Sequence, residues 1–287
     1  MGRIVFIDGR FVSEIEAKVS GFDRSFLYGD GLFETLSVYR SVPFRWEAHM
    51  ERLGQGAKFL GLSVPLSPSE LRRQAEVLIA RNRMPEALLR LTVSRGVGRR
   101  GYSPRGADRP CIVMTLHPAP ARDSVPEAGW KLATASVRLP AGDALARFKT
   151  CSKLAQVMAR AEAEAAGADE ALLLSTEGFV VEAASANLFW VRSGVVETAP
   201  MGAGILAGVT RSVVLELCRD LGVPCAEAQV KSRELVGAQA VFLSLSSHGI
   251  IPACVLDGLP IGRSPVVTRL TDAYRELLHR ETSQNTA

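Results

Sequence analysis

Residues 170–221 read EALLLSTEGFVVEAASANLFWVRSGVVETAPMGAGILAGVTRSVVLELCRDL and carry the clearest fold signal of the chain. The first part of this run places short apolar stretches between turn residues, which is typical of consecutive strands. Ser193-Gly194 has the composition of a two-residue hairpin turn. The pattern predicts a meander of four strands, at 170–175, 179–183, 187–192 and 195–198.

The second part of the run predicts a helix with Thr210 as its N-cap and Gly222 just beyond its end. The residues expected to face inward lie at helical spacing: Val213, Val214, Leu217 and Leu221. An earlier helix is predicted after Ser152, again as N-cap, and ends before Gly167. Its inward residues are predicted to be Leu154, Val157, Met158, Ala161 and Ala165.

The N-terminal part of the chain shows the same mixture of strands and helices. A hairpin is predicted around Asp8-Gly9, a helix begins near His49, and Ser67-Pro68 starts another helix. The segment 118–126 is rich in proline and has little periodicity, so we expect a linker there. The sequence thus predicts two α+β domains, a smaller one at 1–117 and a larger one at 127–287.

Composition excludes several classes of protein. The chain has 287 residues, 47% hydrophobic and 22% charged, close to an ordinary globular protein. The net charge of +4 comes from 28 arginines and six lysines that are scattered among acidic residues. This distribution favours a small anionic ligand over nucleic acid, because arginine binds carboxylate and phosphate in a bidentate manner.

The cysteines and the apolar runs bear on metals and location. The five cysteines show no metal-ligand spacing, so we expect no metal site. No apolar run reaches the roughly 18 residues that a membrane span needs, and no secretion signal is present, so we expect no membrane association and a cytoplasmic protein.

Three features point to chemistry without settling it. Lys149 stands in an irregular stretch before a predicted helix, whereas Lys153 falls in the first turn expected for that helix. The glycine-rich run 202–210 precedes another helix, and a helix N-terminus reached through glycines can bind phosphate. Glu182 lies between two apolar strands, where a carboxylate needs a partner such as a cation. Each feature alone is also compatible with an ordinary surface residue or turn.

Taken together, these motifs resemble those of the class IV aminotransferases, which are pyridoxal-phosphate (PLP) enzymes of fold type IV related to D-amino-acid aminotransferase. Tyr28-Gly-Asp-Gly-Leu-Phe-Glu-Thr-Leu36 resembles the N-terminal signature of the family, and His49-Met-Glu-Arg-Leu53 resembles its short helix motif. The other matching motifs are Phe148-Lys-Thr150, Glu182 with Asn187-Leu-Phe189, Gly204–Arg211, and Ser246-Ser247.

The resemblance implies roles for individual residues. Lys149, not Lys153, is expected to carry PLP as a Schiff base, and Glu182 is expected to pair with the pyridine nitrogen. Phosphate and other cofactor contacts are expected at Arg52, Ser185, Val209, Thr210, Ser246 and Ser247. Substrate contacts are expected at Phe33, Arg100 and Tyr102. The resemblance also implies a homodimer.

The family includes several activities on amines and amino acids, and the sequence favours one of them. Ser94-Arg-Gly-Val-Gly-Arg-Arg-Gly-Tyr-Ser103 most resembles 4-amino-4-deoxychorismate lyase, which forms 4-aminobenzoate and pyruvate for folate synthesis. Branched-chain or D-amino-acid transamination and (R)-selective amine transamination stay open. Phe33 stands where D-amino-acid enzymes usually have tyrosine, and Ser152 where the lyases often have asparagine. A non-enzymatic anion-binding protein is the remaining alternative.

Overall fold

The computed structural model of the chain describes residues 2–121 and 125–283. The chain divides into two compact units, which we call the first unit (Met1–Ala119, Phe148–Lys153 and Leu278–Ala287) and the second unit (Pro120–Arg147 and Leu154–Leu277). Residues 122–124, in the middle of the expected linker at 118–126, lie outside the described residues. Unlike the division expected from the sequence, the first unit also takes in residues 148–153 and 278–287.

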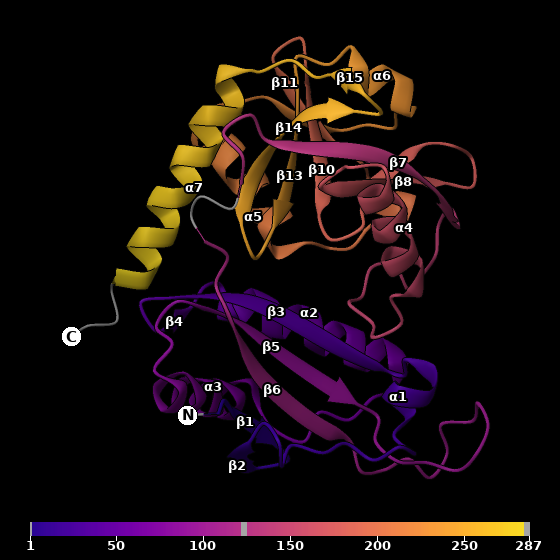
Figure 1. Cartoon of the computed structure of the whole chain (residues 1–287), viewed down its shortest axis with the longest axis vertical. Coiled ribbons are helices and arrows are strands. Elements are labelled where there is room, and N and C mark those ends of the chain that lie inside the picture. The colour runs from indigo at the N-terminus through magenta and orange to yellow at the C-terminus, as the bar shows by residue number, and fades with distance from the viewer. Residues whose placement is uncertain (1, 122–124, 284–287) are drawn as a thin grey trace. The chain divides into compact units, whose positions relative to one another are not determined.

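The first unit is built on a six-stranded sheet in the order β2-β1-β6-β5-β3-β4, in which all neighbours are antiparallel (Figure 1). The expected hairpin is confirmed, since Asp8 and Gly9 both have positive φ between β1 and β2. The strands are β1 Ile4–Ile7, β2 Arg10–Ser13, β3 Gly31–Tyr39, β4 Val42–Pro43, β5 Ala87–Ser94 and β6 Cys111–Pro118.

Helices α2 (Trp46–Leu60) and α3 (Pro68–Asn82) bury their apolar faces on this sheet, and α1 (Arg24–Tyr28) precedes β3. Ser67 caps α3 in a capping box with Glu70, as Ser67-Pro68 predicts. Alternate residues of β3, namely Leu32, Leu36 and Val38, contribute to the core shared with the helices. Phe33 therefore points to the opposite face of β3.

The second unit contains a nine-stranded sheet that mixes parallel and antiparallel pairs (Figure 1). Its order is β12-β11-β10-β13-β14-β7-β8-β9, with β15 paired to β14. The meander predicted from residues 170–198 is confirmed as β8 to β11. The strands are β7 Trp130–Leu139, β8 Glu170–Ser175, β9 Val180–Ala183, β10 Asn187–Arg192, β11 Val195–Thr198, β12 Cys225–Glu227, β13 Ala240–Leu245, β14 Gly249–Leu256 and β15 Leu259–Pro260.

Two helix predictions for the second unit need correction. Thr210 is not the N-cap of α5, because Gly208 holds that position and makes no side-chain cap. Helix α4 turns Ala159 and Ala163 inward, whereas Leu154, Val157 and Met158 are exposed. The helices are α4 Leu154–Ala165, α5 Val209–Asp220, α6 Ser232–Val236 and α7 Pro265–Ser283, with a 3-10 turn at Met201–Ala203.

Helix α7 continues into the first unit from Leu278. None of the helices in the described ranges is long and apolar enough to cross a membrane.

Candidate active site

Lys149 lies in a segment that pairs with the free edge of β3. Strand β4 covers only the far end of that edge, at Val38 and Tyr39. At the near end, the backbone N–H of Phe33 donates to Lys149 O (2.9 Å), and Cys151 N–H donates to Gly31 O (2.9 Å). These hydrogen bonds fix the backbone on both sides of the lysine, so Lys149 projects from an ordered position.

The side chain of Lys149 lies against the face of an aromatic ring. Its Nζ is 4.6 Å from the centroid of Phe33, and the guanidinium carbon of Arg90 is 3.8 Å from the same centroid. Aromatic rings attract cations through their negative faces. Phe33 therefore brings two cationic side chains to one face of the first unit's sheet.

Arg90 is a candidate functional residue that the sequence analysis did not identify. It stands in β5 between the core residues Leu89 and Leu91, so it points away from α2 and α3. Burial lowers the pKa of its guanidinium. Within the described part of the chain no carboxylate pairs with Arg90, which makes it available to an anionic ligand. The signal in the sequence is the single charge in the apolar run Leu88–Val93.

Arg52 is held by a buried carboxylate, Glu34. The guanidinium of Arg52 donates to both oxygens of Glu34, from Nε at 2.8 Å and from Nη2 at 2.5 Å. His49 Nδ1, one turn earlier on α2, lies 2.7 Å from Glu34 Oε2. All three side chains are buried, and Glu34 is only 1% exposed.

The electrostatics of this triad follow from its burial. Burial raises the pKa of Glu34, but the charge and hydrogen bonds of Arg52, together with His49, outweigh this effect and lower it to about 2. Burial lowers the pKa of His49, only partly opposed by Glu34. The triad therefore carries a fixed ion pair at neutral pH, and Glu34 orients Arg52 through two hydrogen bonds.

In the second unit, Glu182 is fixed by backbone and amide donors. It lies on β9, opposite Leu173 of β8. Its Oε2 accepts a hydrogen bond from Leu206 N (2.9 Å) and a longer one from Asn187 Nδ2 (3.4 Å). Asn187 also donates to Leu206 O (3.0 Å), so the strand end and the glycine-rich run are joined around this carboxylate.

The N-terminus of α5 has the features of an anion site. Its N-cap is Gly208, which provides no capping side chain, and the first turn contains no acidic residue. A Cβ at Gly208 would lie 1.9 Å from Asn187 Oδ1, so only glycine allows this approach. Val209 and Thr210, both buried, supply the first N–H groups of the helix. Unpaired N–H groups at the positive end of a helix bind phosphate.

The serines expected near the cofactor have different surroundings. Ser185 donates its hydroxyl to Glu170, which is fully buried and also pairs with Arg160. Ser247 Oγ lies 2.8 Å from Nδ1 of its neighbour His248. Ser246 follows β13 and is half-buried.

The loop between β5 and β6 exposes the residues expected to bind substrate. The side chain of Arg100 is exposed, and Tyr102 packs only its edge on Tyr28, with centroids 5.6 Å apart. Arg95 differs from its neighbours, because it is buried and paired with Asp30 at 2.8 Å. Of the arginines in this loop, Arg99 and Arg100 therefore face solvent.

Comparison with known proteins identifies the family. Residues 31–256 match the model of the amino-transferase class IV family. The chain is 36% identical to a putative branched-chain-amino-acid aminotransferase of Methanocaldococcus jannaschii, over 95% of this chain and 96% of that protein. It is 29% identical to an aminodeoxychorismate lyase of Bacillus subtilis (strain 168), over 90% of this chain and 88% of that protein.

A solved structure supports the same conclusion. A branched-chain amino acid aminotransferase of T.th., solved with pyridoxamine 5'-phosphate, has 29% identity and a TM-score of 0.91, covering 100% of this chain and 96% of that one. This similarity confirms the expected fold type IV. The family match covers well over half of the sequence and agrees with six motifs in the expected order. The chain therefore belongs to the class IV aminotransferase family and is a pyridoxal-phosphate-dependent enzyme.

Proposed function

We propose that this enzyme is a 4-amino-4-deoxychorismate lyase. The observation that carries the proposal is a pair of arginines, Arg90 and Arg100, for which the described residues supply no carboxylate partner. In contrast, Arg24, Arg52 and Arg95 of the same unit are all paired with acids. Two available guanidinium groups match a substrate with two carboxylates, and aminodeoxychorismate has two.

The residues present fit the cofactor. PLP offers an aldehyde, a phosphate and a pyridine nitrogen, which call for an amine, anion donors and a carboxylate. Lys149 supplies the amine, Arg52 and the uncapped N-terminus of α5 supply anion donors, and Glu182 supplies the carboxylate. Ser185, Ser246 and Ser247 stay proposed cofactor contacts, with Ser185 acting through its hydrogen bond to Glu170.

Each residue then has a defined task. Bound PLP supplies a ring that accepts electrons from the substrate. Lys149 holds the cofactor covalently and, after the substrate amine displaces it, takes a proton from the substrate ring. Glu182 keeps a proton on the pyridine nitrogen, and Arg100 with Tyr102 binds a substrate carboxylate. Loss of the ring proton, with breakage of the C–O bond to the enolpyruvyl group, releases pyruvate and leaves an aromatic ring.

A product assay tests the proposed reaction. The holoenzyme is expected to release 4-aminobenzoate and pyruvate in equal amounts from aminodeoxychorismate, measured by fluorescence and by a coupled dehydrogenase. The second candidate, amino-acid transamination, is favoured by the similarity to the Methanocaldococcus jannaschii protein. An enzyme that forms no 4-aminobenzoate but exchanges amino groups between amino acids and 2-oxo acids would establish that second candidate.

Arg100→Lys tests carboxylate recognition. Lysine keeps the charge but loses the two-point fork, so kcat/KM for a carboxylate substrate should fall by about 1.5–3 kcal/mol. Alanine and alaninol, which differ only in the carboxylate, are compared in single turnovers followed by cofactor absorbance. Alaninol should be little affected, and cofactor absorbance at rest should be unchanged. Equal losses on both compounds would contradict recognition of the carboxylate by Arg100.

We also propose that the enzyme is a homodimer. The first unit exposes several large apolar side chains around α1 and the neighbouring loops, including Phe22 (72% exposed), Phe26 (76%) and Ile15 (83%). Exposed apolar patches of this kind mark protein interfaces. Light scattering of the holoenzyme should give twice the chain mass of 30.9 kDa, and Phe26→Asp should shift the protein toward that single-chain mass. A wild-type enzyme with the single-chain mass would refute the dimer.

A further inference from the structure

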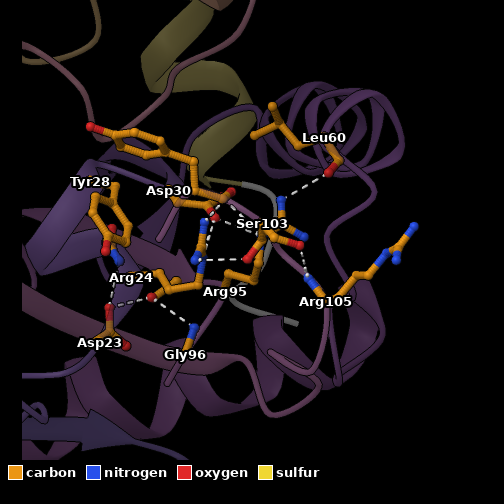
Figure 2. Close-up of polar contacts among 12 residues, drawn as sticks. Asp23, Arg24, Tyr28, Asp30, Leu60, Arg95, Gly96, Ser103 and Arg105 are labelled. Carbon is orange, nitrogen blue, oxygen red and sulfur yellow. Dashed lines mark hydrogen bonds and ion pairs between the residues drawn. The ribbon is translucent and has the colours of Figure 1, made fainter. Parts of the chain in front are cut away.

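Arg24 makes an unusual set of contacts with the loop that carries Arg100. Its Nη1 donates to Gly101 O (2.9 Å) and Ser103 O (3.1 Å), and its Nη2 donates to Tyr102 O (3.0 Å). One buried guanidinium thus binds three consecutive carbonyl oxygens directly after Arg100. Figure 2 shows Arg24 between the end of this loop and Asp30.

Asp30 joins Arg24 to a second arginine. Arg24 Nε donates to Asp30 Oδ2 at 2.8 Å, and Arg95 Nε donates to the same oxygen at 2.8 Å. Burial raises the pKa of Asp30, but hydrogen bonds and charge from Arg95 and Arg24 outweigh it and hold the pKa below its usual value. Asp30 is therefore ionised at neutral pH and orients both guanidinium groups.

Arg95 extends the network to the end of α2. Its Nη1 donates to Gly61 O (2.9 Å) and its Nη2 to Leu60 O (2.9 Å), as Figure 2 shows for Leu60. Carbonyls at the end of a helix lack partners within the helix, so a cation is favourable there. The loop with Arg100 is thus connected, through Arg24, Asp30 and Arg95, to the helix that carries Arg52. We call these three residues the arginine clamp.

The start of the loop is fixed as firmly as its end. Arg24 N–H donates to Gly96 O (2.9 Å), and Asp23 accepts from the hydroxyl of Ser94 (2.5 Å). Gly96 has φ +84°, and a Cβ there would lie 1.8 Å from Arg109 O. Between these anchors the loop contains Gly98 and Gly101, whose backbones are intrinsically mobile. Without the clamp, little else would define the position of Arg100.

We propose that Arg24 is a positioning residue, which holds the loop 96–105 so that Arg100 is placed to bind the substrate carboxylate. The inference rests on the proposed role of Arg100 and adds a residue that touches neither substrate nor cofactor. Among the described residues, the guanidinium of Arg24 donates hydrogen bonds to main-chain carbonyls and Asp30 alone, so its effect on the reaction passes through loop geometry. Lysine cannot replace it, because an ammonium group cannot reach three carbonyls and Asp30 with fixed geometry.

The test compares Arg24→Met, Arg24→Lys and a control, Arg105→Met, in the holoenzyme. Arg105 is an exposed arginine of the same loop, and its side chain makes no hydrogen bond recorded among the described residues. For Arg24→Met, kcat/KM on alanine should fall at least about tenfold, while alaninol should change less than about twofold. Arg24→Lys retains the charge beside Asp30, so it keeps the fold if Arg24→Met does not, and it should show the same selective loss.

A second measurement reads the loop directly. Trypsin cleaves after Arg99 and Arg100, and cleavage of a folded protein follows the opening of the loop. Arg24→Met and Arg24→Lys should be cleaved there at least about tenfold faster than the wild type, with Arg105→Met unchanged. The double variant Arg24→Met/Arg100→Lys should be no slower on alanine than Arg100→Lys alone, because both changes remove the same interaction.

The outcomes separate this inference from the proposed function. Full activity on alanine in both Arg24 variants, while Arg100→Lys is impaired, overturns the positioning role. Equal losses on alanine and alaninol with loss of cofactor absorbance also overturn it, since Arg24 then only supports the fold. If Arg100→Lys is unimpaired, the role of Arg100 is wrong. Faster cleavage in the Arg24 variants would then show that the clamp holds the loop without positioning a carboxylate ligand, which also overturns the inference.

Discussion

Lys149→Ala is expected to abolish the visible absorbance of covalently bound PLP and to lower turnover by about 10²–10⁴-fold or more. Alanine can neither hold the cofactor nor take a proton from the substrate. The position is sensitive because the backbone of Lys149 is bound to the edge of β3 and its amine lies on the ring of Phe33. Absorbance spectra and single-turnover rates of the purified variant measure both effects.

Lys153→Ala is the matched control. Lys153 is four residues further along, immediately before α4, and we expect this variant to keep both absorbance and activity. Borohydride reduction followed by peptide mass spectrometry locates the lysine that carries PLP. Label found on Lys153 would show that the assignment of Lys149 is wrong.

Glu34→Gln is expected to lower the free energy of unfolding by about 3–5 kcal/mol, the usual cost of removing one partner from a buried ion pair. The neutral amide leaves Arg52 and His49 without the buried carboxylate that both contact. It also releases the guanidinium from its two-point orientation, so the affinity of the apoenzyme for PLP should fall. Urea unfolding and cofactor titration measure the two effects.

Glu76→Gln provides the control for that variant. Glu76 pairs with Arg72 on the exposed side of α3, and its side chain is 51% exposed. An exposed pair of this kind contributes about 0–1 kcal/mol, so little stability should be lost. If Glu34→Gln were as stable as Glu76→Gln, the triad would not be a source of stability.

The pH dependence of stability gives an independent sign for Glu34. The pKa of this carboxyl is about 2 in the folded protein, against an ordinary value of 4.5. The folded pKa is lowered, so the stabilisation is fully present above pH 4.5 and is lost as the pH falls toward 2. Stability of the wild type should therefore fall between these values, and Glu34→Gln should lack that part of the fall.

How far the sequence predicts the molecule depends on the range of the interaction. The capping box at Ser67 and the turn at Asp8-Gly9 are local, and both are confirmed. The partners of Arg52 and Arg90 are tertiary, and no spacing pattern announces Glu34 as the acid that holds Arg52. Such pairs become visible only when β3, β5 and α2 are assembled.

Helix α4 shows a different reason for failure. Its periodic apolar residues identify an amphipathic helix, but periodicity does not say which surface covers the apolar stripe. The small side chains Ala159 and Ala163 face inward and join the core formed with β7 and β8, while Leu154, Val157 and Met158 remain exposed. Thr210 fails for a smaller reason, because α5 begins one residue earlier than the capping pattern suggests.

The pairing of residues 149–151 with β3 has a consequence for anyone who divides this protein. A fragment that ends at Ala119 would contain all six strands of the first sheet but would leave the near end of β3 uncovered. Bare strand edges recruit other chains, so such a fragment should aggregate. Exchange of the first unit between relatives would have to transplant Phe148–Lys153 together with residues 1–119. The catalytic lysine is thus inherited with the N-terminal sheet, although it lies far along the chain from it.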